Sequence, residues 1–217
     1  MMTRLEKIFH NLEKHSTKWS GYFDVYERHL SRFVEKHPSI LEVGILGGGS
    51  LELWEKYFNG ATITGIDIVP QCADYKYEFP VEIIIGNQES PEFWQDFWDR
   101  RDPYDIIIDD GGHTMNQQIV TLEHCYPHLA DGGIYVVEDV HTSYWDNWGG
   151  LFRRPATFLE YSKRIVDHLN KQHFTQSLLP ENELKIFEDL YSVYFYNSMV
   201  VFEKKCNQKF EIVDNKL

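Results

Sequence analysis

The chain has 217 residues, of which 42% are hydrophobic and 15% aromatic, which excludes a disordered protein and suffices for one domain with a buried core. Its 34 acidic and 21 basic residues give a formal charge of −13 without any basic stripe, so nucleic acid is not an expected partner. We expect a cytoplasmic protein without a membrane partner, because no apolar run suits a signal peptide or a membrane span.

The first part of the chain predicts a helix, a strand, a glycine-rich loop and a second helix. Apolar residues recur at helical spacing from Tyr22 to Val34 and stop before Pro38. Residues 40–44 predict a buried strand, residues 47–50 a turn and residues 51–58 a helix. A strand followed by a glycine loop and a helix is typical of nucleotide-binding domains.

The middle of the chain repeats units of one strand and one helix. Strands are predicted at 61–67, 81–86, 104–110 and 134–139, with helices at 91–98 and 114–129, the second broken near its end by Pro127. A glycine turn, Asp131-Gly132-Gly133, should precede the last of these strands. Repeated units of this length predict a parallel sheet with right-handed crossovers.

The last part of the chain departs from this pattern. Residues 141–155 predict an aromatic loop over the site, 157–170 a helix, and 190–196 and 199–204 an antiparallel hairpin. The fold class is therefore α/β, a doubly wound, mostly parallel seven-stranded sheet with an antiparallel C-terminal hairpin. We expect one domain over residues 1–217, with residues 1–37 as an N-terminal helical segment.

Acidic residues end two of the predicted strands. Asp109 and Asp110 follow one apolar run, and Glu138 and Asp139 follow the next, with His113 close behind the first pair. The carboxyl ends of parallel strands meet at one edge, where crowded carboxylates require a divalent cation or raised pKa values. Helix capping and turn formation are the structural alternative. Repetition of the pattern at two strand ends favours a functional site.

The glycine loop suits a cofactor without a pyrophosphate. Leu46 stands where the second glycine of a dinucleotide-binding motif belongs. The pattern Glu42-x-Gly44-x-x-x-Gly48-x-Ser50 has the acidic, glycine-spaced form of S-adenosylmethionine (SAM) sites. Asp67, at the end of the next strand, could accept hydrogen bonds from two ribose hydroxyls. A glycine turn made only for tight packing is the alternative.

Three blocks carry a resemblance to a known family. They are Thr17-Lys18-Trp19 with Tyr22 and Tyr26-Glu27-Arg28-His29, then the glycine loop with Asp67, and then 109–113 together with 138–145. Over roughly residues 17–145 the chain resembles the class I SAM-dependent methyltransferases. More narrowly, it resembles the metal-dependent O-methyltransferases that modify sugars of macrolides and related glycosides.

The resemblance implies a role for each group of residues. Asp110, Glu138 and Asp139 would hold Mg²⁺ or a similar ion, and His113 would be the general base. Residues implied at the SAM site are Glu42, Gly44, Gly48, Ser50, Asp67, Asn87, Gln88 and Asp109. Lys18, Trp19 and Tyr22 would form an N-terminal lid beside them, although Thr17 stands where an acid often precedes that lysine. His141, Tyr144 and Trp145 are candidates for substrate contact, with core filling as the alternative for the aromatic pair.

We therefore expect methyl transfer from SAM to a hydroxyl of a sugar or glycosylated small molecule. A carboxylate-bound Mg²⁺ would lower the pKa of the hydroxyl while His113 takes its proton. A homo-oligomer is compatible with the sequence. The alternatives are an NAD-dependent dehydrogenase or epimerase, a SAM-fold binding protein without activity, a catechol methyltransferase, and the hydroxylase-named relatives of cephalosporin pathways.

Overall fold

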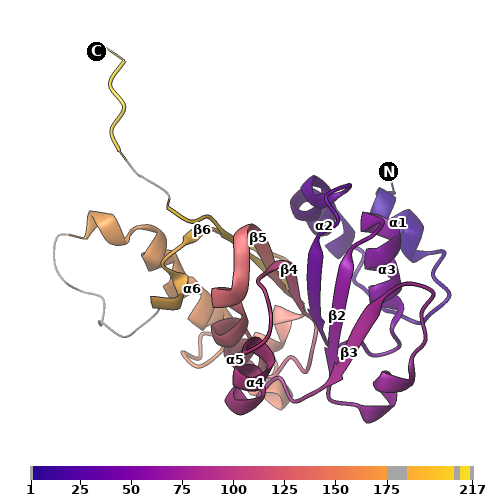
Figure 1. Ribbon diagram of the computed structural model, residues 1–217. Coiled ribbons are helices and arrows are strands. Elements are labelled where there is room, and N and C mark those ends of the chain that lie inside the picture. Colours follow the sequence, from indigo (N-terminus) through magenta and orange to yellow (C-terminus); the bar gives the residue numbers. More distant parts are fainter. Residues whose placement is uncertain (1, 175–184, 208–210, 216–217) are drawn as a thin grey trace.

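The computed structural model describes residues 2–174, 185–207 and 211–215, built around one seven-stranded sheet (Figure 1). The strand order is β3-β2-β1-β4-β5-β7-β6. In chain order the strands are β1 (Ser39–Val43), β2 (Thr62–Asp67), β3 (Val81–Ile85), β4 (Tyr104–Asp109), β5 (Leu129–Val137), β6 (Leu190–Tyr196) and β7 (Met199–Lys204).

The sheet is parallel from β3 to β5, and β7 is antiparallel to both β5 and β6. This arrangement confirms the predicted fold class, including the closing hairpin. The order of the strands reverses between β1 and β4, so the loops after these strands diverge at the carboxyl edge. Ligands bind at such a switch point in open α/β sheets.

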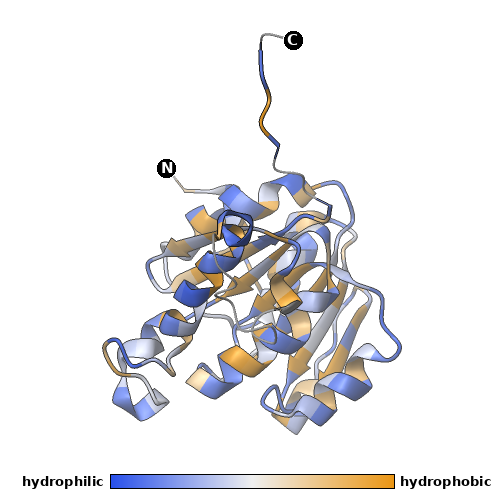
Figure 2. Cartoon of the chain, turned by 90° about the vertical axis from the view of Figure 1, so that its left-hand side faces the viewer, coloured by the Kyte–Doolittle hydropathy of each residue, from blue (hydrophilic) through white to orange (hydrophobic). Residues whose placement is uncertain are grey.

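Helices cover both faces of the sheet. On one face lie α1 (Arg4–Phe9), α2 (Tyr22–Leu30) and α3 (Gly49–Phe58), and on the other α4 (Pro91–Trp98), α5 (Met115–Cys125) and α6 (Phe158–Leu169) (Figure 1). Successive side chains of β4 point to opposite faces of the sheet and so contribute to both hydrophobic cores. Ile106 and Ile108 pack with the first group of helices and Ile107 with the second. Figure 2 shows the hydrophobic residues concentrated along the strands between these helices.

One predicted boundary was confirmed and another was wrong. The helix expected over 114–129, with a break near Pro127, ends at Cys125 and continues as a 3-10 turn over Tyr126–His128, because Pro127 cannot extend the α-helix. The next strand begins at Leu129, which pairs with Tyr104, so the glycines expected in a turn lie inside β5. A register shift between Tyr104 and Ile106 absorbs the extra residues there.

The start of helix α5 positions the loop before it. Thr114 caps this helix through a capping box with Gln117, which fixes the end of the 109–113 loop. Helix α1 lies within the predicted N-terminal helical segment, residues 1–37, but was not predicted as a separate helix. Within the described residues, no helix combines the length and apolar character needed to cross a membrane.

Candidate active site

A cavity of about 730 Å³ lies at the carboxyl edge of the sheet. Its walls come from the N-terminal segment and from the loops after β1 to β5. The predicted site residues that line it are Lys18, Trp19, Tyr22, Gly44, Ser50, Asp67, Asn87, Gln88, Asp110, His113, Glu138 and Asp139. Those that do not line it are Glu42, Gly48, Asp109, His141, Tyr144 and Trp145.

Asp67 organises the glycine loop. One of its carboxylate oxygens accepts hydrogen bonds from the backbone N–H groups of Ile45 (3.0 Å) and Leu46 (3.1 Å), and the other from Val69 (2.9 Å). A carboxylate offers roughly four lone-pair sites, so about one remains for a ligand hydroxyl. The main role of Asp67 is therefore to hold the backbone of the cavity wall. It has fewer free acceptor sites for the two ribose hydroxyls than the sequence suggested.

The glycines of the loop allow the protein to pack tightly against itself. Gly44 has a positive φ of 84°, and a Cβ there would lie 2.1 Å from the carbonyl oxygen of Asp110. A Cβ on Gly48 would lie 2.3 Å from the hydroxyl of Tyr77. Gly44 thus brings the loop after β1 against the loop after β4, and Gly48 serves packing outside the cavity wall.

Glu42 and Asp109 are buried below the cavity. The indole of Trp54 donates a 3.0 Å hydrogen bond to Glu42, and the amide of Gln88 donates one of 3.0 Å to Asp109. Burial raises the pKa of each carboxyl to about 7, against the opposing effects of Lys18 on Glu42 and of Gln88 on Asp109. Gln88 also accepts a 2.6 Å hydrogen bond from the N–H of Gly112. Asp109 and Gln88 together support the loop that carries His113.

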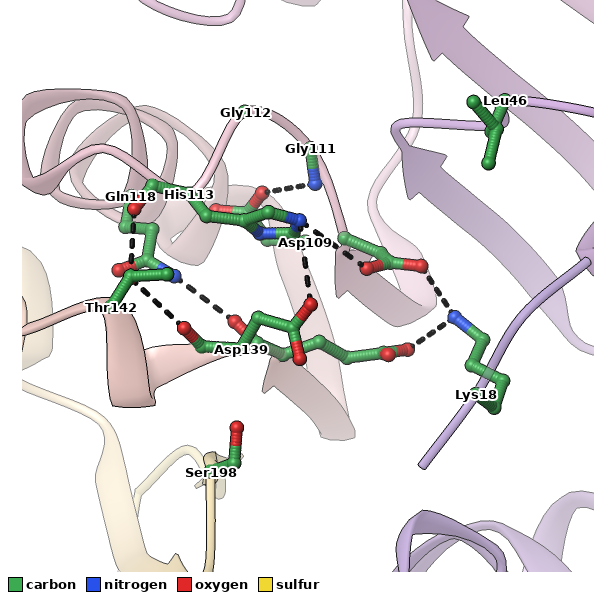
Figure 3. Close-up of polar contacts among 12 residues, drawn as sticks. Lys18, Leu46, Asp109, Gly111, Gly112, His113, Gln118, Asp139, Thr142 and Ser198 are labelled. Carbon is green, nitrogen blue, oxygen red and sulfur yellow. Dashed lines mark hydrogen bonds and ion pairs between the residues drawn. The ribbon is translucent and has the colours of Figure 1, made fainter. Parts of the chain in front are cut away.

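Lys18 supplies a positive charge to the acidic edge. Its ammonium lies 2.5 Å from Asp110 and 2.6 Å from Glu138, and its side chain is 1% exposed (Figure 3). Burial alone would lower the pKa of Lys18, but the two carboxylates outweigh it and hold the pKa above its usual range. The ammonium therefore contacts two of the three carboxylates predicted to bind a metal.

His113 lies beside the third carboxylate. Its Nε2 atom is 3.5 Å from Asp139 and 3.9 Å from Asp110. One possible ligand atom from each of these three residues lies within 4.8 Å of the other two, so the cluster fits a cation, and its carboxylate oxygens suit a hard divalent one. Burial lowers the pKa of His113 despite the two acids, which leaves the imidazole neutral and able to accept a proton.

Both His113 and Asp139 have left-handed backbone conformations, with φ values of 58° and 54°. Non-glycine residues adopt this conformation at a cost, and it occurs often at functional sites. The hydroxyl of Thr142 lies 2.8 Å from the carbonyl oxygen of His113 and 2.9 Å from that of Asp139 (Figure 3). Thr142 thereby connects the two strained residues that face each other.

Two further residues at the acidic edge were not predicted as site residues. The hydroxyl of Tyr26 donates a short hydrogen bond to Glu138, and Ser198 in the β6–β7 turn contacts both Tyr22 and His141. The available sequence signal was the spacing of Tyr22 and Tyr26, four residues apart and so on one helix face. Nothing local in the sequence brings Ser198 to the site.

The predicted substrate residues form an aromatic group outside the cavity. The ring of His141 lies edge-on to those of Trp19 and Trp145, with centroid distances of 5.9 Å and 4.4 Å. The ring of Tyr144 stacks on that of Phe152 at 6.4 Å. Tyr144 and Trp145 are about half exposed, so neither fills the core, which was the alternative role for them.

Comparison with known proteins connects this geometry to a chemistry. The chain is 30% identical over 203 residues to "8-demethyl-8-alpha-L-rhamnosyl tetracenomycin-C 2'-O-methyltransferase" of Streptomyces olivaceus, covering 88% of this chain and 53% of that protein. It is 32% identical over 199 residues to "Demethylmacrocin O-methyltransferase" of Streptomyces fradiae, covering 85% and 48%. No protein-family model matches the chain.

A solved structure agrees with these relatives. The MycE methyltransferase from the mycinamycin biosynthetic pathway, in complex with Mg, SAH and mycinamycin VI, superimposes with a TM-score of 0.78 at 26% identity. The match covers 94% of this chain and 53% of that one. The resemblance to sugar O-methyltransferases is therefore confirmed. The chain spans about half the length of the curated relatives it matches.

Proposed function

We propose that this protein is a metal-dependent O-methyltransferase that moves the methyl group of SAM to a hydroxyl of a sugar-containing small molecule. One observation carries the proposal. The glycine loop with Asp67 and the acidic edge with His113 line a single cavity, so a methyl donor and an acceptor can meet there. The relatives named above supply the acceptor class.

His113 is the proton acceptor in this proposal. A neutral imidazole is needed to take the hydroxyl proton, and the lowered pKa of His113 favours that form. Asp139, 3.5 Å away, stabilises the imidazolium that results. Thr142 limits movement of the His113 backbone, so the ring stays directed at the carboxylates.

Asp110, Glu138 and Asp139 are the proposed holders of the divalent cation. When bound, the cation would orient the acceptor oxygens and lower the pKa of the hydroxyl. Asp110 and Asp139 already approach one another, whereas Glu138 is engaged by Lys18 and Tyr26. Lys18 limits repulsion between Asp110 and Glu138, and a bound cation would compete with its ammonium for these two carboxylates.

Trp19, His141 and Trp145 are proposed to contact the acceptor. Their rings adjoin one another, and Trp19 also donates a 3.1 Å hydrogen bond to Asp139. Aromatic faces pack against the apolar faces of sugar rings, so this group suits a glycosylated acceptor beside the acids. Residues 1–37 are proposed to act as the lid that brings Trp19 to this position.

Calorimetric titration with SAH and with NAD tests the cofactor. We expect SAH to bind and NAD not to bind, since Leu46 replaces the glycine that a pyrophosphate requires. Comparable NAD affinity would favour a dehydrogenase or epimerase.

Turnover with SAM and a glycosylated polyketide should stop on chelation and return with Mg²⁺. Full turnover after exhaustive chelation would refute the metal dependence.

A further inference from the structure

The two consecutive acids at the end of β5 each receive a tyrosine hydroxyl from helix α2. Tyr22 reaches Asp139 and Tyr26 reaches Glu138, although these pairs are 117 and 112 residues apart in the sequence. The tyrosines stand one helical turn apart, and the acids are adjacent on the strand end. One rigid helix therefore contacts both carboxylates in register.

Tyr22 holds Asp139 at two points. Its hydroxyl donates a 2.6 Å hydrogen bond to the carboxylate and accepts a 3.0 Å hydrogen bond from the backbone N–H of the same residue. Ser198 lies 2.8 Å from that hydroxyl. Asp139 has a left-handed backbone, and such a conformation persists only where surrounding contacts hold it, as the bond from its N–H to Tyr22 does here.

Tyr26 holds Glu138 from a fully packed position. Tyr26 is 1% exposed, and its ring lies edge-on to that of Trp54 at a centroid distance of 5.0 Å. Trp54 in turn donates to Glu42. The phenol thus cannot swing away without disturbing the core between α2 and α3.

We propose that Tyr22 and Tyr26 are positioning residues that fix Asp139 and Glu138 in the orientation required for binding a divalent cation. This inference rests on the proposed metal dependence of the site. Groups that hydrogen-bond to metal-binding side chains typically change metal affinity by about 10- to 100-fold when removed. Helix α2 therefore serves the acidic edge itself, in addition to covering the cavity.

The test measures binding of Mn²⁺ to the full chain by the loss of the electron paramagnetic resonance signal of free Mn²⁺. Tyr22→Phe and Tyr26→Phe remove only the hydroxyls, and we expect each to weaken Mn²⁺ binding about tenfold or more. Affinity for SAH should change less than threefold, because both rings remain. The double variant should weaken Mn²⁺ binding further.

Tyr57→Phe is the matched control. Tyr57 is also a buried phenol that donates to a carboxylate, through a 2.8 Å bond to Glu27, but it lies away from the acidic edge. Tyr57→Phe should lower the free energy of unfolding without changing the affinity for Mn²⁺. If wild type binds Mn²⁺ and the Tyr22 and Tyr26 variants bind it equally well, the inference is wrong and the proposed function stands. If wild type binds no divalent ion, the metal dependence fails together with the inference.

Discussion

The two halves of the cavity edge satisfy their acidic groups by different means. After β1 and β2, Asp67 accepts three backbone N–H groups from residues close to it in sequence or in the adjoining loop. After β4 and β5, Asp110 and Glu138 depend on the ammonium of Lys18, which lies 92 and 120 residues away in the chain. The cofactor edge is supported locally, and the acidic edge by a distant segment.

This difference separates what each edge can do. Backbone N–H groups hold Asp67 without a second charged side chain. The conformation of the cofactor edge should therefore not depend on side chains elsewhere in the chain. A crowded carboxylate edge needs a compensating cation, and here the N-terminal segment supplies one. The acidic edge should therefore respond to changes in the N-terminal segment and to divalent ions, whereas the cofactor edge should not.

The largest expected effect comes from removing the buried cation. Lys18→Met leaves the buried carboxylate of Glu138 and the partly buried carboxylate of Asp110 without their ion pair, and breaking a buried pair in this way typically costs about 3 kcal/mol or more. We expect that loss of unfolding free energy in chelated buffer, measured by urea denaturation. Added Mg²⁺ should restore more stability to the variant than it adds to wild type, because it replaces the lost positive charge.

Lys56→Met provides the comparison, because the side chain of Lys56, which pairs with Glu52, is 39% exposed. Exposed pairs contribute little, so this variant should lose less than about 1 kcal/mol and gain nothing from Mg²⁺. Equal losses in the two lysine variants would contradict the dependence of the acidic edge on Lys18.

The second prediction concerns the proton acceptor. His113→Ala should lower turnover by about a hundredfold or more, the usual scale for loss of a general base, with little change in SAH affinity. His141→Ala should reduce turnover less, because its ring contacts Trp19 and Trp145 and does not line the cavity. Steady-state kinetics with calorimetry measures both quantities. Near-normal turnover in His113→Ala would show that another group accepts the proton.

The third prediction concerns the locally supported edge. Asp67→Ala removes the acceptor of three backbone hydrogen bonds, so the glycine loop should loosen and SAH affinity should fall about tenfold. Asp105→Ala is the control, because Asp105 also accepts a backbone N–H, from Ser39 at 2.8 Å, but at the opposite end of the sheet. Calorimetry should find its SAH affinity unchanged. A similar loss in both variants would indicate a general loss of stability.

The sequence was sufficient for the fold because the relevant signals were local. Apolar runs ending in acids predicted β4 and β5, and two apolar runs over 190–196 and 199–204 predicted the closing hairpin. The boundary error at Leu129 arose where pairing with Tyr104 outweighed the turn preference of two glycines. Tertiary pairing of this kind has no local signature.

The site was only partly predictable for the same reason. Parallel strands bring their carboxyl ends together, so the acids and His113 were expected as neighbours. The ion pairs of Lys18 and the hydrogen bonds of Tyr22 and Tyr26 depend on how α2 packs across the sheet, which spacing along the chain does not encode. The Thr142 contact between two left-handed residues is likewise a product of the folded loops.

The smallest expected effect tests whether burial of a carboxyl at the cofactor edge costs stability. Burial raises the pKa of Glu42 from 4.5 to about 7, so the folded protein retains a proton that the unfolded chain releases. The stability of wild type should therefore fall as the pH rises from about 4.5 to about 7.

Glu42→Gln cannot ionise but keeps an acceptor for Trp54. The variant should match wild type near pH 4.5 and should not show this fall, so it should be the more stable protein at pH 8. Thermal melts at the two pH values should show a higher melting temperature for the variant only at the higher pH. A gain of the same size at both pH values would mean that ionisation of Glu42 is not its cause.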